Sequence, residues 1–395
     1  MTEKNKGQIG LAGVFAMLSL TLMGLGSNAV TPVMATLAAH FEGRNVSFIQ
    51  TVATLSMVAG SLLAGAVMGK KIRTKTLAVW GSFLCLIFGI LPVGIENFEM
   101  ILVVRAVFGF ALGLISPLGN ALIMMHFKGK KQESLLGIGT FSMNIGGIAF
   151  QMLSGVLADI SWQLSFFGHI FFVIAFVMSF FLPKEELQKI QQGEQAKEKL
   201  NVRSVALIGV LILIFQTVNL SVMMSASTLF EVRNVGGAAV AATALTAFSV
   251  TGMFAGLIFG PIFQKCRRSM FLLAFGFVAA GAYVIFAGKT ALVMGAGYAL
   301  FGIGFNWQFI TFTAWVGMRT PESTIGTGTS VLLAMMNLGG FLSSFWMILL
   351  GNDLMKILMA DMILSMILAA VLFVASPFKT RRERISDNSI SDSAV

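Results

Sequence analysis

The sequence predicts an all-α polytopic membrane protein with twelve transmembrane helices arranged as two six-helix pseudo-repeats. Three observations support this prediction: the composition, a segment that occurs twice, and the distribution of basic residues. Of 395 residues, 56% are hydrophobic and only 11% are charged, and the mean hydropathy is +0.87. In soluble globular proteins roughly a quarter of all residues are charged, so this composition is typical of a protein whose surface faces lipid.

Apolar stretches recur along the whole chain, and each is long enough to cross about 30 Å of hydrocarbon as a helix. We identify twelve of them, at residues 9–35, 47–68, 76–95, 99–125, 134–157, 163–183, 204–228, 238–263, 270–288, 291–316, 324–350 and 355–377. The first stretch is too long for the apolar part of a signal peptide and lacks a processing site. We therefore expect it to be the first span.

A segment in the first half is repeated in the second half. Residues 133–140, ESLLGIGT, correspond to residues 322–329, ESTIGTGT, and each copy is followed by an Asn-(Ile/Leu)-Gly-Gly sequence. A second pair, at 65–77 and 260–272, is separated by 195 residues, against 189 for the first pair. A duplicated half in a membrane protein is typical of a transporter.

The basic residues predict the topology. With the N-terminus inside, 22 of the 27 Lys and Arg residues fall in cytoplasmic segments, and the exceptions are Arg44, Arg105, Arg233, Lys289 and Lys356. A missing or additional span would destroy this separation, so the positive-inside rule predicts twelve spans in the plasma (inner) membrane with both termini cytoplasmic. The net charge of +10 then reflects topology and contact with anionic lipid, and no nucleic-acid partner is expected.

The predicted organisation follows from these spans. Residues 1–183 form an N-terminal six-helix bundle, 184–203 a hydrophilic cytoplasmic linker, 204–377 a C-terminal six-helix bundle and 378–395 a cytoplasmic tail. The linker also has the composition of an amphipathic helix on the membrane surface. The two cysteines belong to separate elements on a reducing side, so no disulfide is expected.

The sequence lacks the residue arrangements that catalysis and cofactor binding require. The three histidines have no metal-ligand spacing, and neither a Ser/His/Asp arrangement nor a phosphate-binding loop is found. A membrane enzyme would need polar groups that converge at one interface, and a sensor would carry an added soluble domain. We therefore expect a protein that is not an enzyme and binds neither a metal nor a cofactor.

Three motifs resemble those of the major facilitator superfamily. A basic loop after a glycine lies between the second and third spans and again between the eighth and ninth. Residues 105–109, RAVFG, match that superfamily's Arg-x-x-x-Gly pattern, and residues 161–163, SWQ, resemble its Ser-Trp-Arg element. The resemblance covers nearly the whole chain and is closest to the twelve-span drug and metabolite transporters. It implies two bundles, a central site between them and alternating access by rocking.

The basic loops depart from the family pattern, because the usual Asp is replaced by Gly69 in the first half and by Gln264 in the second. Six cations remain in these loops: Lys70, Lys71, Arg73, Lys265, Arg267 and Arg268. They either only set the topology or also meet helix C-termini of the opposite bundle and close a cytoplasmic gate. The fifth span lacks the Gly-Pro typical of proton-coupled exporters, which weakens an antiport interpretation.

By resemblance, spans 1, 4, 7 and 10 face the cavity, flanked by spans 2, 5, 8 and 11, and the bodies of these eight spans contain no Asp or Glu. The candidate substrate-binding residues are therefore Arg105 together with Asn28, Asn120, Gln151, Gln216, Asn219, Asn306, Trp307 and Gln308. Arg105 is the one charge among them. It either binds a substrate anion or bonds backbone groups and acts in gating.

Asp361 and His169 are the other ionisable groups inside spans, and they lie 192 residues apart at nearly equivalent repeat positions. Their spans are peripheral in the family. Each is a candidate for proton coupling, and structural pairing with another helix is the alternative.

The sequence thus predicts a secondary-active or facilitated transporter of a small organic solute, with an organic anion or weak acid steered by Arg105 as the first interpretation. The alternative is proton-coupled efflux of lipophilic, multidrug-type compounds, for which the 25 Met and 36 Phe residues would provide an adaptable cavity. The expected partners are the solute, the lipid bilayer and protons, and the chain is expected to act as a monomer. Symport and antiport both stay open.

Overall fold

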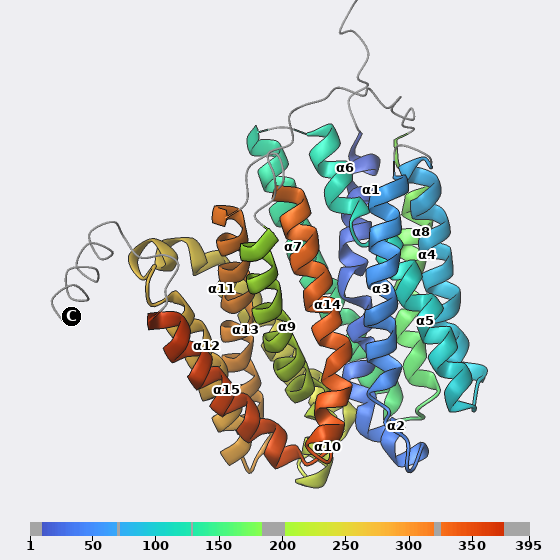
Figure 1. The fold of residues 1–395 in the computed structure, drawn as a ribbon. Coiled ribbons are helices and arrows are strands. Elements are labelled where there is room, and N and C mark those ends of the chain that lie inside the picture. Colours follow the sequence, from blue (N-terminus) through green and yellow to red (C-terminus); the bar gives the residue numbers. More distant parts are fainter. Residues whose placement is uncertain (1–9, 69–71, 128, 184–201, 320–324, 375–395) are drawn as a thin grey trace, which may run out of the picture.

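The computed structural model describes residues 10–68, 72–127, 129–183, 202–319 and 325–374 (Figure 1). Within these ranges the chain is helical and contains no strand, which confirms the all-α class. The elements of the first half are α1 (Leu11–Leu22), η1 (Met23–Val33), α2 (Met34–His40), α3 (Phe48–Val67), α4 (Thr74–Ile90), η2 (Leu91–Gly94), α5 (Phe98–Ile115), α6 (Leu118–His126), α7 (Gly129–Ala158), η3 (Leu164–Phe171) and α8 (Phe172–Ser179). Those of the second half are α9 (Val202–Met224), α10 (Ala226–Val232), α11 (Ala238–Lys265), α12 (Met270–Ala287), α13 (Ala291–Arg319), α14 (Ile325–Leu349) and α15 (Leu354–Val374).

The described helices account for all twelve predicted spans. Ten segments, some of them two or three helices joined end to end, are long and apolar enough to cross a membrane. The shorter apolar segment Leu164–Ser179 and the 29-residue helix α13 cover the positions of the other two predicted spans but are not among those ten. Most of the predicted linker and the whole of the predicted tail lie outside the described residues, so the surface-helix interpretation of residues 184–203 stays a prediction.

Two spans that the sequence predicts as continuous helices are interrupted beside a proline. Pro32 lies in the 3₁₀ segment η1, which joins α1 to α2, and Pro117 separates α5 from α6. Proline has no N–H to donate and crowds the preceding turn, so the regular ladder ends there. Neighbouring helices enclose both interruptions, as irregular backbone within a membrane requires.

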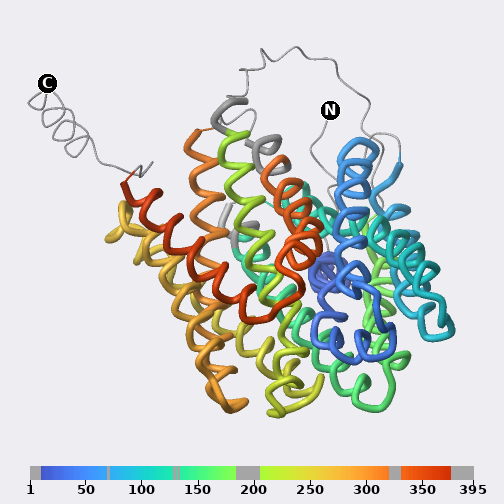
Figure 2. Tube along the Cα trace, turned by 60° about the horizontal axis from the view of Figure 1, so that its bottom comes forward, coloured from blue at the N-terminus to red at the C-terminus, as the bar shows by residue number. Residues whose placement is uncertain are grey.

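The helices form two bundles, the first from α1 to α8 and the second from α9 to α15. Figure 1 shows the second bundle on the left and the first on the right, with α7 and α14 at the junction. The cross-bundle packing joins α7 to α11 and α14 to α3, and Figure 2 shows the same two-part arrangement from another direction.

The two bundles repeat one tight helix contact. A Cβ on Gly109 of α5 would lie 2.0 Å from the carbonyl oxygen of Ala53 in α3. Its counterpart 193 residues later, Gly302 of α13, would approach the carbonyl oxygen of Phe248 in α11 to 2.1 Å. Only glycine permits such backbone approach, which drives helix association in membranes through close packing.

The repeated Asn-x-Gly-Gly sequence makes a second shared contact. A Cβ on Gly146 of α7 would lie 2.0 Å from the carbonyl oxygen of Leu22, at the end of α1. A Cβ on Gly339 of α14 would lie 2.4 Å from the carbonyl oxygen of Leu213 in α9. The duplicated motif therefore packs the fifth span on the first and the eleventh on the seventh.

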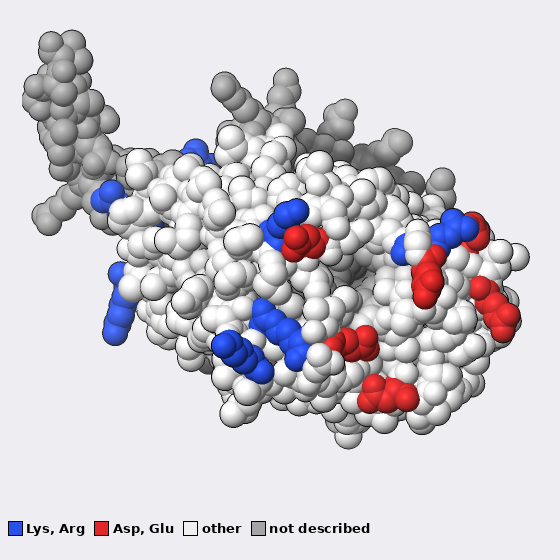
Figure 3. Space-filling view, turned by 90° about the horizontal axis from the view of Figure 1, so that it is seen from below, with Lys and Arg blue, Asp and Glu red and all other residues white. Residues whose placement is uncertain are grey.

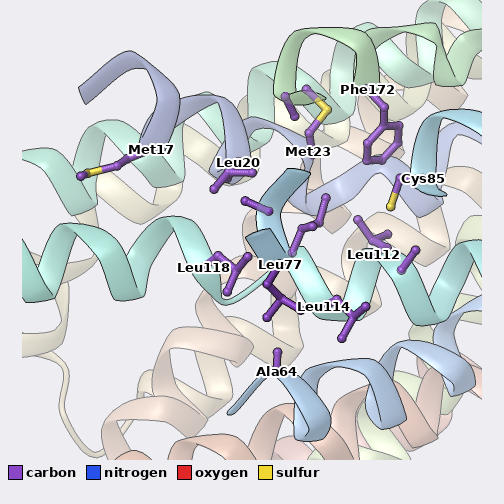
Figure 4. Packing of buried hydrophobic residues seen from close by; sticks show 14 of the residues in the cluster. Met17, Leu20, Met23, Ala64, Leu77, Cys85, Leu112, Leu114, Leu118 and Phe172 are labelled. Carbon is purple, nitrogen blue, oxygen red and sulfur yellow. The ribbon is translucent and has the colours of Figure 1, made fainter. Parts of the chain in front are cut away.

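Apolar side chains fill the interior of each bundle. In the first bundle, Leu20, Leu77, Leu112 and Phe172 belong to one buried cluster, which Figure 4 shows converging from several helices. Large apolar side chains also cover the outside, where Leu292, for example, is 85% exposed. A surface of this kind is stable against lipid rather than water, as expected of a multi-pass membrane protein.

Candidate functional site

The bundles meet near one end, which we call the α2 end because α2 and α10 lie there; the opposite end is the α1 end. The backbone N–H of Ala35 in α2 donates to Oγ of Ser227 in α10 at 2.8 Å. A Cβ on Gly155 of α7 would lie 2.6 Å from the Cβ of Ala242 in α11. These contacts close the α2 end across the bundle boundary.

Three buried hydroxyl groups reinforce this closure, and we call them the hydroxyl cluster: Ser47, Thr51 and Ser344. Oγ of Ser344 in α14 lies 2.7 Å from Oγ of Ser47 and 2.7 Å from Oγ1 of Thr51, at the start of α3. No charge takes part, so breaking the cluster exposes neutral groups that water can satisfy. A neutral seal of this kind can open and close at modest cost.

Toward the α1 end the same helices separate. In α11, Ala241 and Leu245 near the α2 end are fully buried, whereas Leu257 and Ile258 further along are 71% and 52% exposed. A Cβ on Gly137 of α7 or on Gly260 of α11 would meet no atom within 4 Å, although the same two helices touch at Gly155 and Ala242 nearer the α2 end. The described contacts across the boundary thus gather toward the α2 end, and we interpret the space between the bundles as open toward the α1 end.

Amide side chains lie where the bundles meet. Oγ1 of Thr31 donates to Oε1 of Gln50 at 2.9 Å, and Nε2 of Gln50 lies 3.5 Å from Oδ1 of Asn28. Gln50 is followed four residues later by Thr54, and a Cβ on Gly340 of the other bundle would lie 3.1 Å from the methyl carbon of Thr54. Gln50 therefore shares the side of α3 that faces the second bundle.

Gln151 occupies the corresponding side of α7. One turn before it Gly147 abuts Leu25 of η1, and one turn after it Gly155 abuts Ala242 of the second bundle. Residues four apart share a helix face, so Gln151 lies on the side turned toward the bundle boundary. It is 1% exposed, and its Oε1 has no hydrogen-bond partner in the part of the chain that the structure describes.

Gln216 provides an amide from the second bundle. A Cβ on Gly339 of α14 would lie 3.0 Å from its Cβ, so Gln216 packs on α14 of its own bundle, next to Gly340, which abuts Thr54 of the first bundle. Its Oε1 also lacks a partner. We call Asn28, Gln50, Gln151 and Gln216 the interface amides.

Other predicted cavity residues lie inside the second bundle. Nε1 of Trp307 donates to the carbonyl oxygen of Ala255 at 2.9 Å, and Asn306 lies in a groove of α11 beside Gly252. Gln308 is fully buried and lies one turn after Gly304, which abuts α12. Neither Oε1 nor Nε2 of its amide has a hydrogen-bond partner among the described residues.

The two remaining predicted amides differ in exposure. Nδ2 of Asn219 donates to the carbonyl oxygen of Phe215 at 2.7 Å, and the side chain is 2% exposed. Asn120 of α6 is exposed and lies beside Gly139 of α7, in the half of the molecule toward the α1 end. Asn120 therefore lies along the open half, and Asn219 lies inside its bundle.

Arg105 is enclosed by the first bundle. Its Nε donates to the carbonyl oxygen of Ile49 in α3 at 3.0 Å, and its Nη1 lies 3.2 Å from Nε2 of His169. The guanidinium lies over the ring of Phe108 at 4.4 Å, and Nη2 has no hydrogen-bond partner. The side chain is 0% exposed, and its contacts come from α3, α5 and η3 rather than from the bundle boundary.

The contacts of His169 determine its tautomer. Nδ1 lies 3.0 Å from the carbonyl oxygen of Phe166, which can only accept, so Nδ1 carries the proton. Arg105 can only donate, so Nε2 accepts and the ring is neutral. If Nε2 were protonated, its N–H would face the N–H of Arg105 Nη1, and neither group could accept a hydrogen bond.

Asp361, the third ionisable residue predicted inside a span, is also 0% exposed, and neither carboxyl oxygen has a hydrogen-bond partner in the described structure. The pairing with another helix that the sequence suggested is therefore not seen for Asp361 among the described residues. His169 does have such a partner.

The predicted gating cations in the described part of the chain do not lie against the opposite bundle. Arg73, Lys265 and Arg267 are exposed, and the guanidinium of Arg268 lies 5.0 Å from the ring centre of Phe373 within its own bundle. This arrangement fits an open α1 end. Lys70 and Lys71 lie outside the described residues, so their gating role stays a prediction.

Acidic and basic side chains lie side by side at the α2 end, as Figure 3 shows, and they include the ion pairs Arg44–Glu99 and Lys356–Asp353. Glu42, Glu96 and Glu99 belong to the first bundle and line a shallow depression of about 520 Å³ together with Arg44. This depression does not lie between the bundles. The described residues contain no group of three or more His, Cys, Asp or Glu side chains that could hold a metal ion.

The sequence did not indicate Gln50 or the hydroxyl cluster as functional residues. They lie on or beside α3 and α14, two of the flanking spans, and Ser and Thr in such helices commonly bond their own backbone. A sequence signal was available for Gln50, since an amide in an apolar span three residues after Ser47 and four before Thr54 marks a polar helix face.

Comparisons with known proteins agree with this architecture. The family model of the Major Facilitator Superfamily matches residues 16–344. The crystal structure of the nucleoside transporter NupG has a TM-score of 0.75 and 13% identity, covering 94% of this chain and 100% of that one. A search of curated protein sequences gives no match.

Two further solved structures share the fold. A D-xylose-proton symporter has a TM-score of 0.73 and 15% identity, covering 93% of this chain and 97% of the symporter. A POT family transporter in complex with 5-aminolevulinic acid has a TM-score of 0.71 and 13% identity, covering 94% and 98% of the two chains. These proteins are transporters rather than enzymes, and the family match extends over most of the chain. The protein is a member of the major facilitator superfamily, a multi-pass membrane transporter of small solutes.

Proposed function

We propose that this transporter carries a small, uncharged, polar organic solute by alternating access, and that the described conformation is open to the cytoplasm. The observation that supports this most strongly is the bundle boundary itself. It is closed by neutral contacts at the α2 end, is open at the α1 end, and bears amides with unused hydrogen-bonding capacity at the junction.

The orientation follows from the charges. By the positive-inside rule, the α1 end, with Arg73, Lys265 and Arg267, is the cytoplasmic end, and the termini lie on that side of the plasma membrane. The α2 end, which carries Glu42, Glu96 and Glu99 among others, is then extracellular.

The preference for an uncharged solute comes from the location of the ionisable groups. Among Asp, Glu, Lys, Arg and His in the described spans, only Arg105, His169 and Asp361 lie away from the span ends, and Arg105 is enclosed within the first bundle. An ionised solute at the boundary would lose water without gaining a counter-charge, which is costly in low dielectric. Free amide oxygens instead fit hydroxyl or N–H donors.

The organic-anion and multidrug interpretations have weaker support. An anion would need access to Arg105, whose described contacts are all within the first bundle. A lipophilic compound would leave the free oxygens of Gln151 and Gln216 unsatisfied. Among the solved structures that share the fold, two are named for nucleosides and D-xylose, which bear several hydroxyl groups, and one is bound to 5-aminolevulinic acid, so the preference for an uncharged solute rests on the boundary residues.

The test is flux into liposomes that contain the purified protein, across matched panels of nucleosides and sugars, organic anions, and lipophilic cations. We expect saturable entry only in the first panel. Gln216→Leu should raise the KM about two- to tenfold, the equivalent of one neutral hydrogen bond. Gln308→Leu is the matched control, because that amide is equally buried but lies on the α12 side, and its KM should be unchanged. Saturable entry of anions alone would contradict the proposal.

A further inference from the structure

Asp361 lies within the apolar interior of the second bundle. Its neighbours on α15, Ile357 and Leu358, belong to a buried cluster with Val278 of α12 and Phe301 of α13. The carboxyl group is 0% exposed, and neither oxygen has a hydrogen-bond partner among the described residues. Buried polar groups in proteins are nearly always satisfied, so such an exception calls for an explanation.

The helices packed on α15 offer this carboxyl group no counter-charge. Helix α15 packs mainly on α12 and also on α9. The ionisable side chain of α12 is Tyr283, which is 60% exposed, and α9 carries only Arg203 near its start. Tyr298 of α13 donates to the carbonyl oxygen of Val222 at 3.4 Å.

The cations near the start of α15 are engaged elsewhere. Arg233 reaches the sulfur of Met355 but bonds the carbonyl oxygens of Ile285 and Phe286, at 2.6 and 2.7 Å. Lys356 lies 3.6 Å from the carboxylate of Asp353. An ionised Asp361 would therefore be buried without compensation, so in this conformation the protonated form is the stable one.

The equivalent position in the first bundle shows what a structural role looks like. His169 precedes Asp361 by 192 residues, and both of its ring nitrogens have partners, Phe166 and Arg105. Asp361 holds no two helices together in this way. In the described conformation, the buried carboxyl group of Asp361 therefore forms no hydrogen bond that would explain why it is there.

We propose that Asp361 is a proton-binding site of the transport cycle, protonated while the cytoplasmic end is open and deprotonated when the extracellular end opens. This rests on the proposed function, because it requires exchange between two conformations. Helix α15 packs on α9, which leads into α10 and its contact with Ala35 across the boundary. The proposal requires that α9 also shifts within the second bundle when that contact breaks, so that its packing on α15 around Asp361 changes. The only ligand is H⁺, and no other bond forms or breaks.

Infrared spectroscopy of the reconstituted protein tests the protonation state directly. We expect a C=O stretching band of a protonated carboxyl group at neutral pH in the wild type, and its absence in Asp361→Asn. Asp353→Asn is the matched control: the backbone N–H of Lys356 lowers the pKa of the Asp353 carboxyl, so this group is ionised at neutral pH and its loss removes no band. Identical spectra for wild type and Asp361→Asn at neutral pH would overturn the proposal.

Flux measurements test the coupling. A gradient of one pH unit drives up to about tenfold accumulation or depletion of solute per coupled proton. We expect this in the wild type and in Asp353→Asn, and equal concentrations on both sides in Asp361→Asn and Asp361→Ser, which still exchange solute without a gradient. Retained gradient-driven accumulation in Asp361→Asn contradicts the inference, whereas absence of any polar-solute flux in the wild type contradicts the proposed function.

Discussion

At the scale of single residues, Arg105 joins three elements of the first bundle directly behind the hydroxyl cluster. Its acceptor on α3, the carbonyl oxygen of Ile49, lies between Ser47 and Thr51 in sequence, and these two residues contact Ser344 across the boundary. Arg105 can therefore act as a positioning residue for the α2-end closure. This role differs from recognition of a substrate anion, and the two predict different effects of mutation.

We predict that Arg105→Ala destabilises the protein by about 2–6 kcal/mol, because Ile49 and His169 lose a buried donor at about 1–3 kcal/mol each. Arg105→Lys keeps the charge but loses the two-pronged geometry and should be intermediate. Solute affinity, measured on the purified variants, should change little. Loss of affinity for an anion with unchanged unfolding temperature would support the substrate role instead.

The sequence predicts that the cavity residues are mainly amides, but it does not predict toward which neighbouring helix several of these side chains point. Amides in the first, fifth and seventh spans were identified; Asn28 and Gln151 lie beside boundary residues and Gln216 packs on α14 next to the boundary, and their role in binding a solute stays a prediction. Trp307 and Gln308 lie inside the second bundle instead. A helix that is apolar all round has no polar stripe to indicate its orientation, so its inner face depends on partner helices that the sequence does not identify.

At the scale of elements, the exceptions to the basic-residue pattern have structural roles. Arg233 lies at the α2 end, where its guanidinium bonds the carbonyl oxygens of Ile285, Phe286 and Gly288 at the C-terminus of α12. These carbonyl groups have no partner within the helix, and a cation there also interacts favourably with the helix dipole. Arg44 instead forms an exposed ion pair with Glu99 at 2.8 Å.

We predict that Arg233→Ala lowers the free energy of unfolding in detergent by about 1–3 kcal/mol, because several carbonyl groups lose a charged donor. Arg44→Ala is the matched control and should cost less than about 1 kcal/mol, as exposed ion pairs do. Equal effects of the two substitutions would show that the Arg233 contacts do not stabilise α12.

The positions of the spans were predictable, but the interruptions within them were not. The eleventh span was expected at 324–350 and occupies Ile325–Leu349. The first span was expected as one helix and contains the 3₁₀ segment Met23–Val33. Hydropathy reports length and lipid contact, whereas the local form of a span also depends on Gly and Pro residues and on the neighbours that enclose them. Pro32 and Pro117 were the available signals.

At the scale of the whole molecule, the two bundles resemble each other internally but meet asymmetrically. Equivalent glycine contacts occur in both, through Gly109 and Gly302 and through Gly146 and Gly339. The boundary between them is closed only toward one end in the described residues. Two bundles joined by a neutral, breakable seal are what alternating access requires, because rocking then exchanges which end is closed.

The most direct test of this account joins the two bundles at the hydroxyl cluster. In a Cys266→Ser background, Ser47→Cys and Ser344→Cys place two thiols where the hydroxyl oxygens lie 2.7 Å apart, while native Cys85 is buried. Oxidation should hold the α2 end shut, abolish solute flux in liposomes and be reversed by reduction, and Ser47→Cys alone should be insensitive to oxidant. Undiminished flux through fully cross-linked protein would contradict alternating access at this boundary.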